Sequence, residues 1–126
     1  MEIKGIVADA AYSNPKGAFH HVGQNLLRIA NPLTDVGTYL GGLTGGVDYN
    51  TLDLTKDVIK INNPVLYQWG ELDDKLPKSV IEPLKEIAQN KGDTVKIYEG
   101  EGHINFNSPE KINDVVKFVS EHMLPE

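Results

Sequence analysis

An aspartate and a histidine stand in two separate turns of this 126-residue chain, each just after a short apolar run. Asp73 follows the run at residues 64–69, and His103 follows the run at residues 94–98, which places them 103 − 73 = 30 residues apart. A carboxylate bound to one imidazole nitrogen leaves the other nitrogen able to take a proton from a hydroxyl group. We therefore interpret Asp73 as the orienting acid and His103 as the base of a pair suited to nucleophilic catalysis.

The elements around these turns should bring the two side chains together. Both apolar runs have the composition of strands, and residues 78–90 between them have the apolar spacing of a helix that ends at Lys91-Gly92. A strand, helix and parallel strand form a right-handed unit in about 98% of cases. The carboxyl ends of parallel strands meet at one edge of the sheet, so we expect Asp73 and His103 within hydrogen-bonding distance.

The remaining elements are read from periodicity and turn residues. Residues 3–10 form a first strand, residues 19–30 a helix closed by Asn31-Pro32, residues 33–40 a second short helix, and residues 53–60 a third. The glycine-rich stretch 41–46 is predicted to be a loop or hinge. A last helix begins at Ser108-Pro109-Glu110, and its expected buried stripe consists of Ile112, Val115, Val116, Val119 and Met123.

The two turns also carry a recognisable pattern. Residues 70–77 read Gly-Glu-Leu-Asp-Asp-Lys-Leu-Pro, and residues 100–103 read Gly-Glu-Gly-His. They resemble the C-terminal part of the α/β-hydrolase family, in which the acid lies in Gly-x-x-Asp-x-x-Val-Pro and the histidine follows Gly-x-Gly. Leu76 stands in place of the valine, and the register of the pattern selects Asp73 over Asp74.

The resemblance implies an α/β fold with three layers, a mostly parallel sheet of about three strands flanked by helices. It implies one partial domain over residues 1–126. Residues 1–12 would be the sixth strand of the family sheet, residues 13–60 a cap-like or lid-like insertion, and residues 61–126 a strand-helix-strand-helix segment carrying the acid and the base.

The nucleophile of that family is missing from this sequence. Its serine lies in a Gly-x-Ser-x-Gly turn upstream of the acid and the histidine, and none of the serines here has such flanks: Ser13, Ser79, Ser108 and Ser120. We expect roughly the last half of a serine hydrolase, produced by truncation, a split gene or design. The parent would hydrolyse a small ester, thioester or amide by acyl transfer, and this chain would be inactive alone. The alternative is a non-catalytic module for dimerisation or protein interaction.

The composition of the chain disfavours several other classes of function. Twelve basic residues against 18 acidic ones give a net charge of −6, which disfavours a nucleic-acid partner. The chain has no cysteine, so disulfides and thiolate metal sites are excluded. No apolar run reaches the roughly 18 residues of a membrane span and no signal peptide is present, so a cytoplasmic location is favoured. We expect no cofactor and no metal.

Several other polar residues are weaker candidates. His20 and His21 are adjacent, so on a helix they should point apart and not share a metal ion. Asp9 ends the first strand and is a minor alternative for the acid. Ser13 follows the same strand end, but no Gly-x-Ser-x-Gly turn surrounds it. His122 lies in the last helical turn, where a cation suits the helix dipole.

Association is expected at the strand edge of residues 3–8. That edge would pair with the nucleophile strand in a complete family sheet and is unpaired in this chain, and open apolar edges recruit further strands. We expect a homodimer, or pairing with the missing N-terminal half, through this edge.

Overall fold

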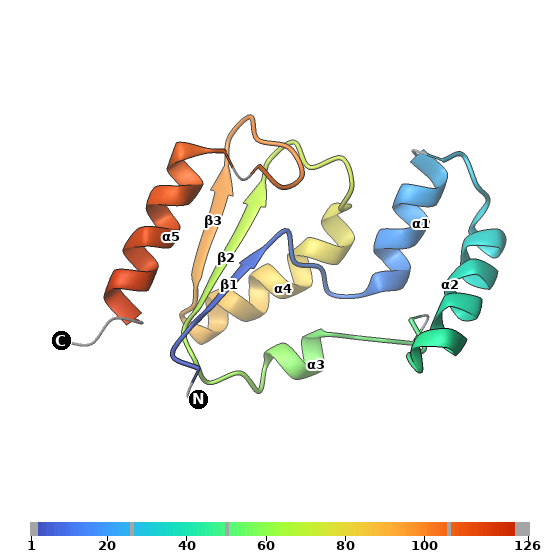
Figure 1. Cartoon of the computed structure of the whole chain (residues 1–126), viewed down its shortest axis with the longest axis horizontal. Helices are drawn as coiled ribbons and strands as arrows, with labels where there is room; N and C mark the ends of the chain where they lie inside the picture. Colours follow the sequence, from blue (N-terminus) through green and yellow to red (C-terminus); the bar gives the residue numbers. More distant parts are fainter. Residues whose placement is uncertain (1–2, 26, 50, 106, 123–126) are drawn as a thin grey trace.

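The computed structural model describes residues 3–25, 27–49, 51–105 and 107–122. Its strands are β1 (Ile6–Asp9), β2 (Val65–Gly70) and β3 (Thr94–Tyr98), and its helices are α1 (Pro15–Asn25), α2 (Asn31–Gly45), α3 (Thr55–Val58), α4 (Lys78–Lys91) and α5 (Pro109–His122). The strands form an open, all-parallel sheet in the order β1-β2-β3 (Figure 1). The predicted α/β class and the strand-helix-strand unit are confirmed.

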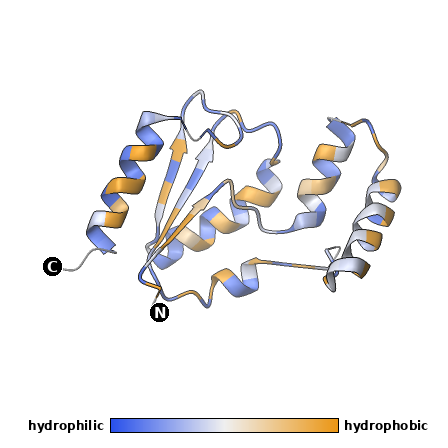
Figure 2. Ribbon diagram, viewed as in Figure 1, coloured by the Kyte–Doolittle hydropathy of each residue, from blue (hydrophilic) through white to orange (hydrophobic). Residues whose placement is uncertain are grey.

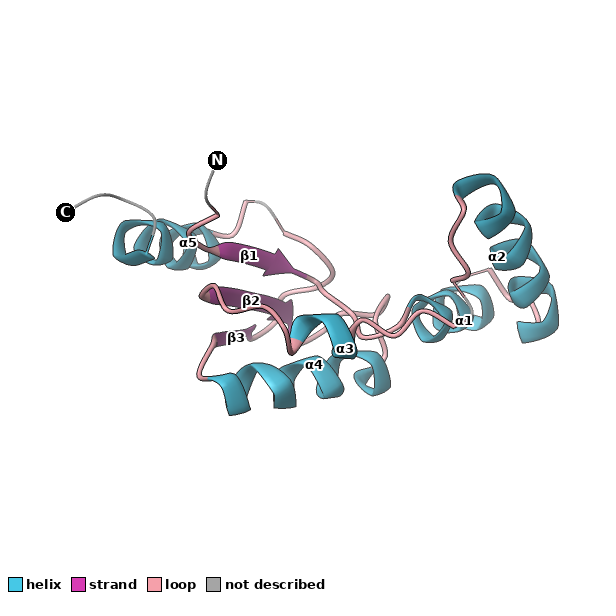
Figure 3. Ribbon diagram, turned by 90° about the horizontal axis from the view of Figure 1, so that it is seen from below, coloured by secondary structure: helices cyan, strands magenta, loops and turns pink. Residues whose placement is uncertain are grey.

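The central strand explains why the sheet needs helices on both faces. Every residue of β2 is buried, as expected for a parallel strand covered on both sides. Helix α4 lies on one face, with α3 beside it, and α5 lies on the other (Figure 3). The main apolar core lies on the α4 face, where the rings of Tyr67 and Trp69 stack at 5.6 Å and α4 contributes Val80 and Leu84. The Trp69 indole N–H donates to the Ala11 carbonyl at 2.7 Å, which fixes the chain just after β1.

The α5 face of the sheet is polar at its centre. The buried Gln68 amide donates to the Tyr98 hydroxyl at 2.6 Å, and that hydroxyl donates to Asp114 on α5 at 2.9 Å. Burial, with the Asp114 carboxylate next in effect, raises the pKa of Tyr98. Lys111 of α5 is buried and pairs with Asp9 of β1 at 3.2 Å. Hydrogen bonds and the ion pairs Lys111–Asp9 and Lys96–Asp114 therefore join α5 to the sheet, where the sequence predicts a buried apolar stripe.

That arrangement corrects the predicted stripe of α5. Ile112 and Val116 are 49% and 61% exposed and Val115 and Val119 are half-buried, whereas Lys111 and Phe118 are buried. Figure 2 shows hydrophobic positions recurring along α5. Met123, the last member of the predicted stripe, lies outside the described residues. The face of α5 that carries Lys111 lies against the sheet, because Lys111 forms an ion pair with Asp9 there.

The segment before β2 differs most from the prediction. Helix α1 covers Pro15–Asn25 and not residues 19–30, and Leu27 and Ile29, expected on its apolar face, are exposed beyond its end. Leu26 lies outside the described residues. Pro32 was expected to close a helix but lies in the first turn of α2, where a missing N–H breaks no intrahelical bond.

The glycine-rich stretch 41–46 was predicted to be a loop, and this prediction is wrong, because the stretch forms the end of α2. Helix α2 runs to Gly45 and ends at Gly46, whose φ of 69° is left-handed. A Cβ on Gly42 would collide with the Val47 carbonyl, and the Val47 N–H binds the Gly42 carbonyl at 3.1 Å. The glycines thus allow the chain to fold back against the helix end. Helices α1 and α2 pack on each other beside the sheet rather than over it (Figure 1).

Candidate acid-base site

The acid stands in the turn that follows β2. The Asp73 side chain is only 2% exposed, and its Oδ1 accepts hydrogen bonds from the backbone N–H groups of Lys75 at 2.8 Å and Leu76 at 3.1 Å. This is the Asx-turn geometry that aspartate forms readily. Two backbone donors therefore fix the orientation of the carboxylate and leave its Oδ2 for another partner.

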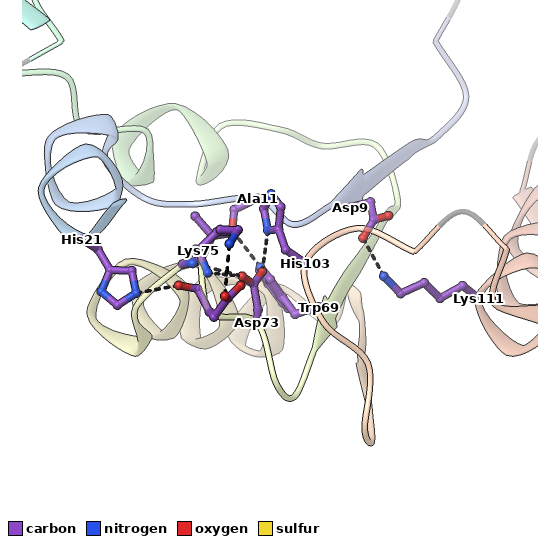
Figure 4. A network of polar contacts seen from close by, with 10 residues as sticks. Asp9, Ala11, His21, Trp69, Asp73, Lys75, His103 and Lys111 are labelled. Carbon is purple, nitrogen blue, oxygen red and sulfur yellow. Dashed lines mark hydrogen bonds and ion pairs between the residues drawn. The ribbon is translucent and has the colours of Figure 1, made fainter. Parts of the chain in front are cut away.

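The base stands in the turn that follows β3. Gly100 has a φ of 71° and starts the curl of the chain that leads to His103. The Nδ1 atom of His103 lies 2.8 Å from Asp73 Oδ2, and Figure 4 shows the two side chains pointing toward each other. An ionised carboxylate can only accept, so Nδ1 carries the proton in this contact. The predicted hydrogen bond between the two side chains is present.

Backbone contacts hold the two turns against each other. The N–H of Glu71 donates to the Tyr98 carbonyl at 2.9 Å, and the N–H of Leu72 donates to the Glu101 carbonyl at 2.8 Å. Gly70 makes this approach possible, because a Cβ at that position would collide with the carbonyls of Glu101 and Gly102. The glycine that begins the acid motif is thus required by a close backbone contact.

A second carboxylate braces the histidine turn from the other side. Glu101 accepts a hydrogen bond from the Asn105 side chain at 2.6 Å. This bond, with a further one from Ser108, lowers the pKa of Glu101. Between these contacts Ile104 has a φ of 42°, which is strained for a β-branched residue. Such strain persists only where surrounding contacts over-determine the backbone, and it often accompanies functional positions. Sequence reasoning missed Glu101, whose role no spacing rule indicates.

The neighbouring carboxylate, Asp74, has a different environment. Its Oδ2 pairs with Lys75 at 3.1 Å, and this hydrogen bond is the main cause of its lowered pKa. The choice of Asp73 over Asp74 therefore agrees with the contacts. The Asp74 carbonyl oxygen lies 2.9 Å from the ring nitrogen Nε2 of His21 on α1. A cavity of about 570 Å³ opens at this junction, with His21, Asp73, Leu76 and Ile81 in its wall.

The other polar candidates have partners of their own. Asp9 pairs with Lys111 and not with His103, so it does not replace Asp73 as the acid. His20 lies 2.6 Å from Asp35 on α2, whereas His21 points to the acid turn, so the adjacent histidines diverge as predicted. The ring of His122 packs on Phe118 at 4.8 Å.

Ser13 is a structural residue. It is 2% exposed, its N–H donates to the Val80 carbonyl at 2.7 Å, and its carbonyl accepts from Leu54 at 2.8 Å. Its hydroxyl accepts a hydrogen bond from the Asn14 side chain at 3.3 Å. These bonds hold the start of α1 against α4 and leave Ser13 in no position to attack a substrate.

Comparisons with known proteins leave the site to be judged on its geometry. No protein-family model matches the chain, and no curated protein matches its sequence. Within the described ranges, no cluster of three histidine or acidic side chains could hold a metal ion. None of the helices in the described part of the chain is long and apolar enough to cross a membrane.

Proposed function

We propose that this chain contributes the acid and the base of a Ser-Asp-His triad, and that it is the C-terminal part of an α/β-hydrolase-like enzyme. The observation that carries the proposal is the 2.8 Å contact between His103 Nδ1 and Asp73 Oδ2 at the carboxyl ends of adjacent parallel strands. The substrate class is a small ester, thioester or amide. The serine comes from sequence that this chain does not contain.

The chemistry follows from the direction of the hydrogen bond. With the proton on Nδ1 held by Asp73, the Nε2 lone pair of His103 can accept the proton of an attacking serine hydroxyl. The buried carboxylate stabilises the imidazolium that forms, and Nε2 then returns the proton to the leaving group. His103 is 31% exposed in its side chain and Asp73 is almost fully buried, so the base is accessible while the acid is shielded.

The experiment is serine labelling in the context of the gene. The chain is expressed together with the reading frame that precedes it and is treated with a fluorophosphonate. We expect one labelled serine in a Gly-x-Ser-x-Gly sequence. His103→Gln and Asp73→Asn should each slow labelling by orders of magnitude, because the serine loses its base or the base loses its orientation.

Matched controls use the other histidine and aspartate contacts of the same chain. His122→Gln and Asp35→Asn remove the same chemical groups far from the acid-base pair and should leave the labelling rate unchanged. The proposal would be overturned if the preceding reading frame held no Gly-x-Ser-x-Gly sequence. It would also be overturned if the His103→Gln and His122→Gln proteins were labelled at equal rates. The non-catalytic interaction module would then be the better account of the chain.

A further inference from the structure

The turn that carries the acid is also held by helix α1. We propose that His21 of α1 is a positioning residue for Asp73, which it holds in place through the peptide group that joins Asp74 to the next residue. The inference rests on the proposed function, in which Asp73 orients His103. It assigns to α1 a part in preparing the base.

The contacts of the His21 ring define its tautomer. Its Nε2 atom lies 2.9 Å from the Asp74 carbonyl oxygen, and its Nδ1 atom lies 2.9 Å from the side-chain amide nitrogen of Asn25. A carbonyl oxygen can only accept a hydrogen bond, so Nε2 carries the proton and Nδ1 accepts one from Asn25. Asn25 lies one turn further along α1, where residues four apart are neighbours. The neutral ring is therefore oriented by its own helix and donates its N–H to the acid turn.

The peptide group that accepts this bond is the one that fixes the acid. The Lys75 N–H belongs to the same peptide group as the Asp74 carbonyl, and it donates to Asp73 Oδ1 at 2.8 Å. No peptide bond in the described part of the chain is cis, so the C=O and N–H of this group point in opposite directions. His21 therefore holds one side of the peptide plane and the Asp73 carboxylate holds the other (Figure 4). Rotation of the plane would break both bonds at once.

A series of hydrogen bonds thus extends from α1 to the base. Asp73 accepts the Lys75 N–H through Oδ1 and the N–H of His103 Nδ1, at 2.8 Å, through Oδ2. Hydrogen bonds in such a series polarise one another, so the bond that His21 donates to the carbonyl makes the N–H of the same peptide group a stronger donor. Loss of the His21 bond should therefore loosen the carboxylate and weaken its hold on the Nδ1–H tautomer of His103.

One face of α1 lies toward the acid turn and α4. Gly17, His21 and Asn25 are spaced four residues apart and so share a face of the helix. A Cβ on Gly17 would collide with the Val80 side chain of α4, so the start of α1 lies close to α4. Farther along, a cavity of about 570 Å³ opens between the two helices, with His21, Asn25 and Ile81 in its wall. A hydrogen bond, and not close packing, therefore connects this part of α1 to the turn.

A different face of α1 contacts α2. His20 lies 2.6 Å from Asp35 on α2. A Cβ on Gly23 would collide with the Thr34 hydroxyl, so the two helices approach closely there. His20 and His21 therefore connect α1 to different neighbours from adjacent positions. They offer a matched pair of substitutions in which only one removes the contact with the acid turn.

Nuclear magnetic resonance of the chain compares His21→Ala with the wild type. We expect the protection of the Lys75 amide from hydrogen exchange to fall about fivefold, because the net contribution of one hydrogen bond corresponds to a factor of that order. Long-range proton–nitrogen spectra should show a smaller Nδ1–H population for His103. His21→Gln should restore both signals toward the wild type, because the glutamine amide N–H can replace the Nε2–H donor. His21 is only half-buried, so both variants should keep the fold.

His20→Ala is the matched control, because it removes a histidine contact of the same helix and leaves the Asp74 carbonyl bonded. The Lys75 and His103 signals should stay as in the wild type. The proposal would be overturned if His21→Ala left either signal unchanged, or if His20→Ala changed them as much as His21→Ala did. Equal effects of His21→Ala and His21→Gln would also contradict it, since packing of the ring and not its donated bond would then hold the turn.

The spectra separate this inference from the proposed function, because they need no serine. If an upstream serine is labelled and its labelling depends on His103 and Asp73, unchanged spectra in His21→Ala would refute the role of His21 alone. If no such serine exists, the triad proposal fails, and the same spectra still show whether His21 orients Asp73.

Discussion

In the described part of the chain, two contacts join a histidine side chain to an aspartate carboxylate, and they have nearly equal lengths but differ in burial and in their other hydrogen bonds. The contact of His103 with Asp73 measures 2.8 Å, and that of His20 with Asp35 measures 2.6 Å. Asp73 is 2% exposed and is held by two backbone donors, whereas Asp35 is 38% exposed and shares its Oδ1 with Lys16 at 3.5 Å. The first pair joins two turns at a sheet edge, and the second joins helices α1 and α2.

The comparison shows that a short contact does not by itself define a catalytic pair. A base must be oriented by an acid that cannot rotate. The Asp73 carboxylate is held through both oxygens, whereas His20 and Lys16 both contact the same oxygen of Asp35. A solvent-exposed polar contact such as His20–Asp35 is weakened by water and by the side-chain entropy lost in forming it. Burial of the carboxylate and its backbone hydrogen bonds, more than the length of the contact, distinguish a candidate catalytic pair from a surface contact.

The largest effect should come from breaking the approach of the two turns, which only the first pair needs. Gly70→Ala places a methyl group into the carbonyls of Glu101 and Gly102, so we expect a loss of about 3 kcal/mol in the free energy of unfolding. Urea unfolding measures it. Gly102→Ala is the control, because a Cβ there meets nothing within 4 Å, and its effect should stay below about 1 kcal/mol. Equal losses in the two variants would show that the close approach at Gly70 is not needed.

Neutralising each aspartate in turn compares the two pairs directly. Asp73→Asn removes a buried charged acceptor and should cost about 1–3 kcal/mol of unfolding free energy. It should also reduce the population of the Nδ1–H tautomer of His103, seen in long-range proton–nitrogen spectra. Asp35→Asn should change stability far less and leave the His103 signals unaltered. If His103 keeps the same tautomer in Asp73→Asn, the carboxylate does not orient it.

A pH titration tests the exposed pair of His20 and Asp35. The hydrogen bond from His20, followed by the charge of Lys16, lowers the pKa of Asp35. A lowered carboxyl pKa contributes stability that is present above the ordinary value of 3.8 and is lost as the pH falls through the lowered value. The protection of the α2 amides, relative to their intrinsic exchange rates, should therefore fall in acid in the wild type. Asp35→Asn should already show the lower protection at neutral pH and lose this acid dependence.

The sequence predicted the acid-base site better than it predicted the segment between the strands. Asp73 and His103 could be found because each follows a strand and carries a glycine pattern, and parallel strands bring such turns together. The contact of His20 with Asp35 could not be found, since it depends on how α1 packs against α2. Residues 41–46 were expected to be a loop from glycine content alone. Close packing of Gly42 against Val47 overrode that propensity.

The burial of α5 shows a different limit. Apolar spacing correctly predicted a helix but not which face it turns to the sheet, because the ion pair between Lys111 and Asp9 selects another face. The Asp9 charge was visible in the sequence, yet its partner 102 residues away was not. Of the predicted stripe, Ile112 and Val116 are therefore exposed, whereas Val115 and Val119 are half-buried.

The smallest measured signal should be the hydrolytic activity of the chain itself, in which Asp73 and His103 have no serine nucleophile beside them. The chain as given should show negligible hydrolysis of activated acyl esters and no labelling by a fluorophosphonate, because the acid and base have no nucleophile to activate. Ser13 is the serine nearest in the chain to a strand end of the sheet, but it is buried and its backbone is bonded to Val80 and Leu54. Intact-mass spectrometry after fluorophosphonate treatment measures this directly, with Ser13→Ala as the matched variant. Stoichiometric labelling of the wild type that disappears in Ser13→Ala would contradict the prediction and would make Ser13 the nucleophile of this chain.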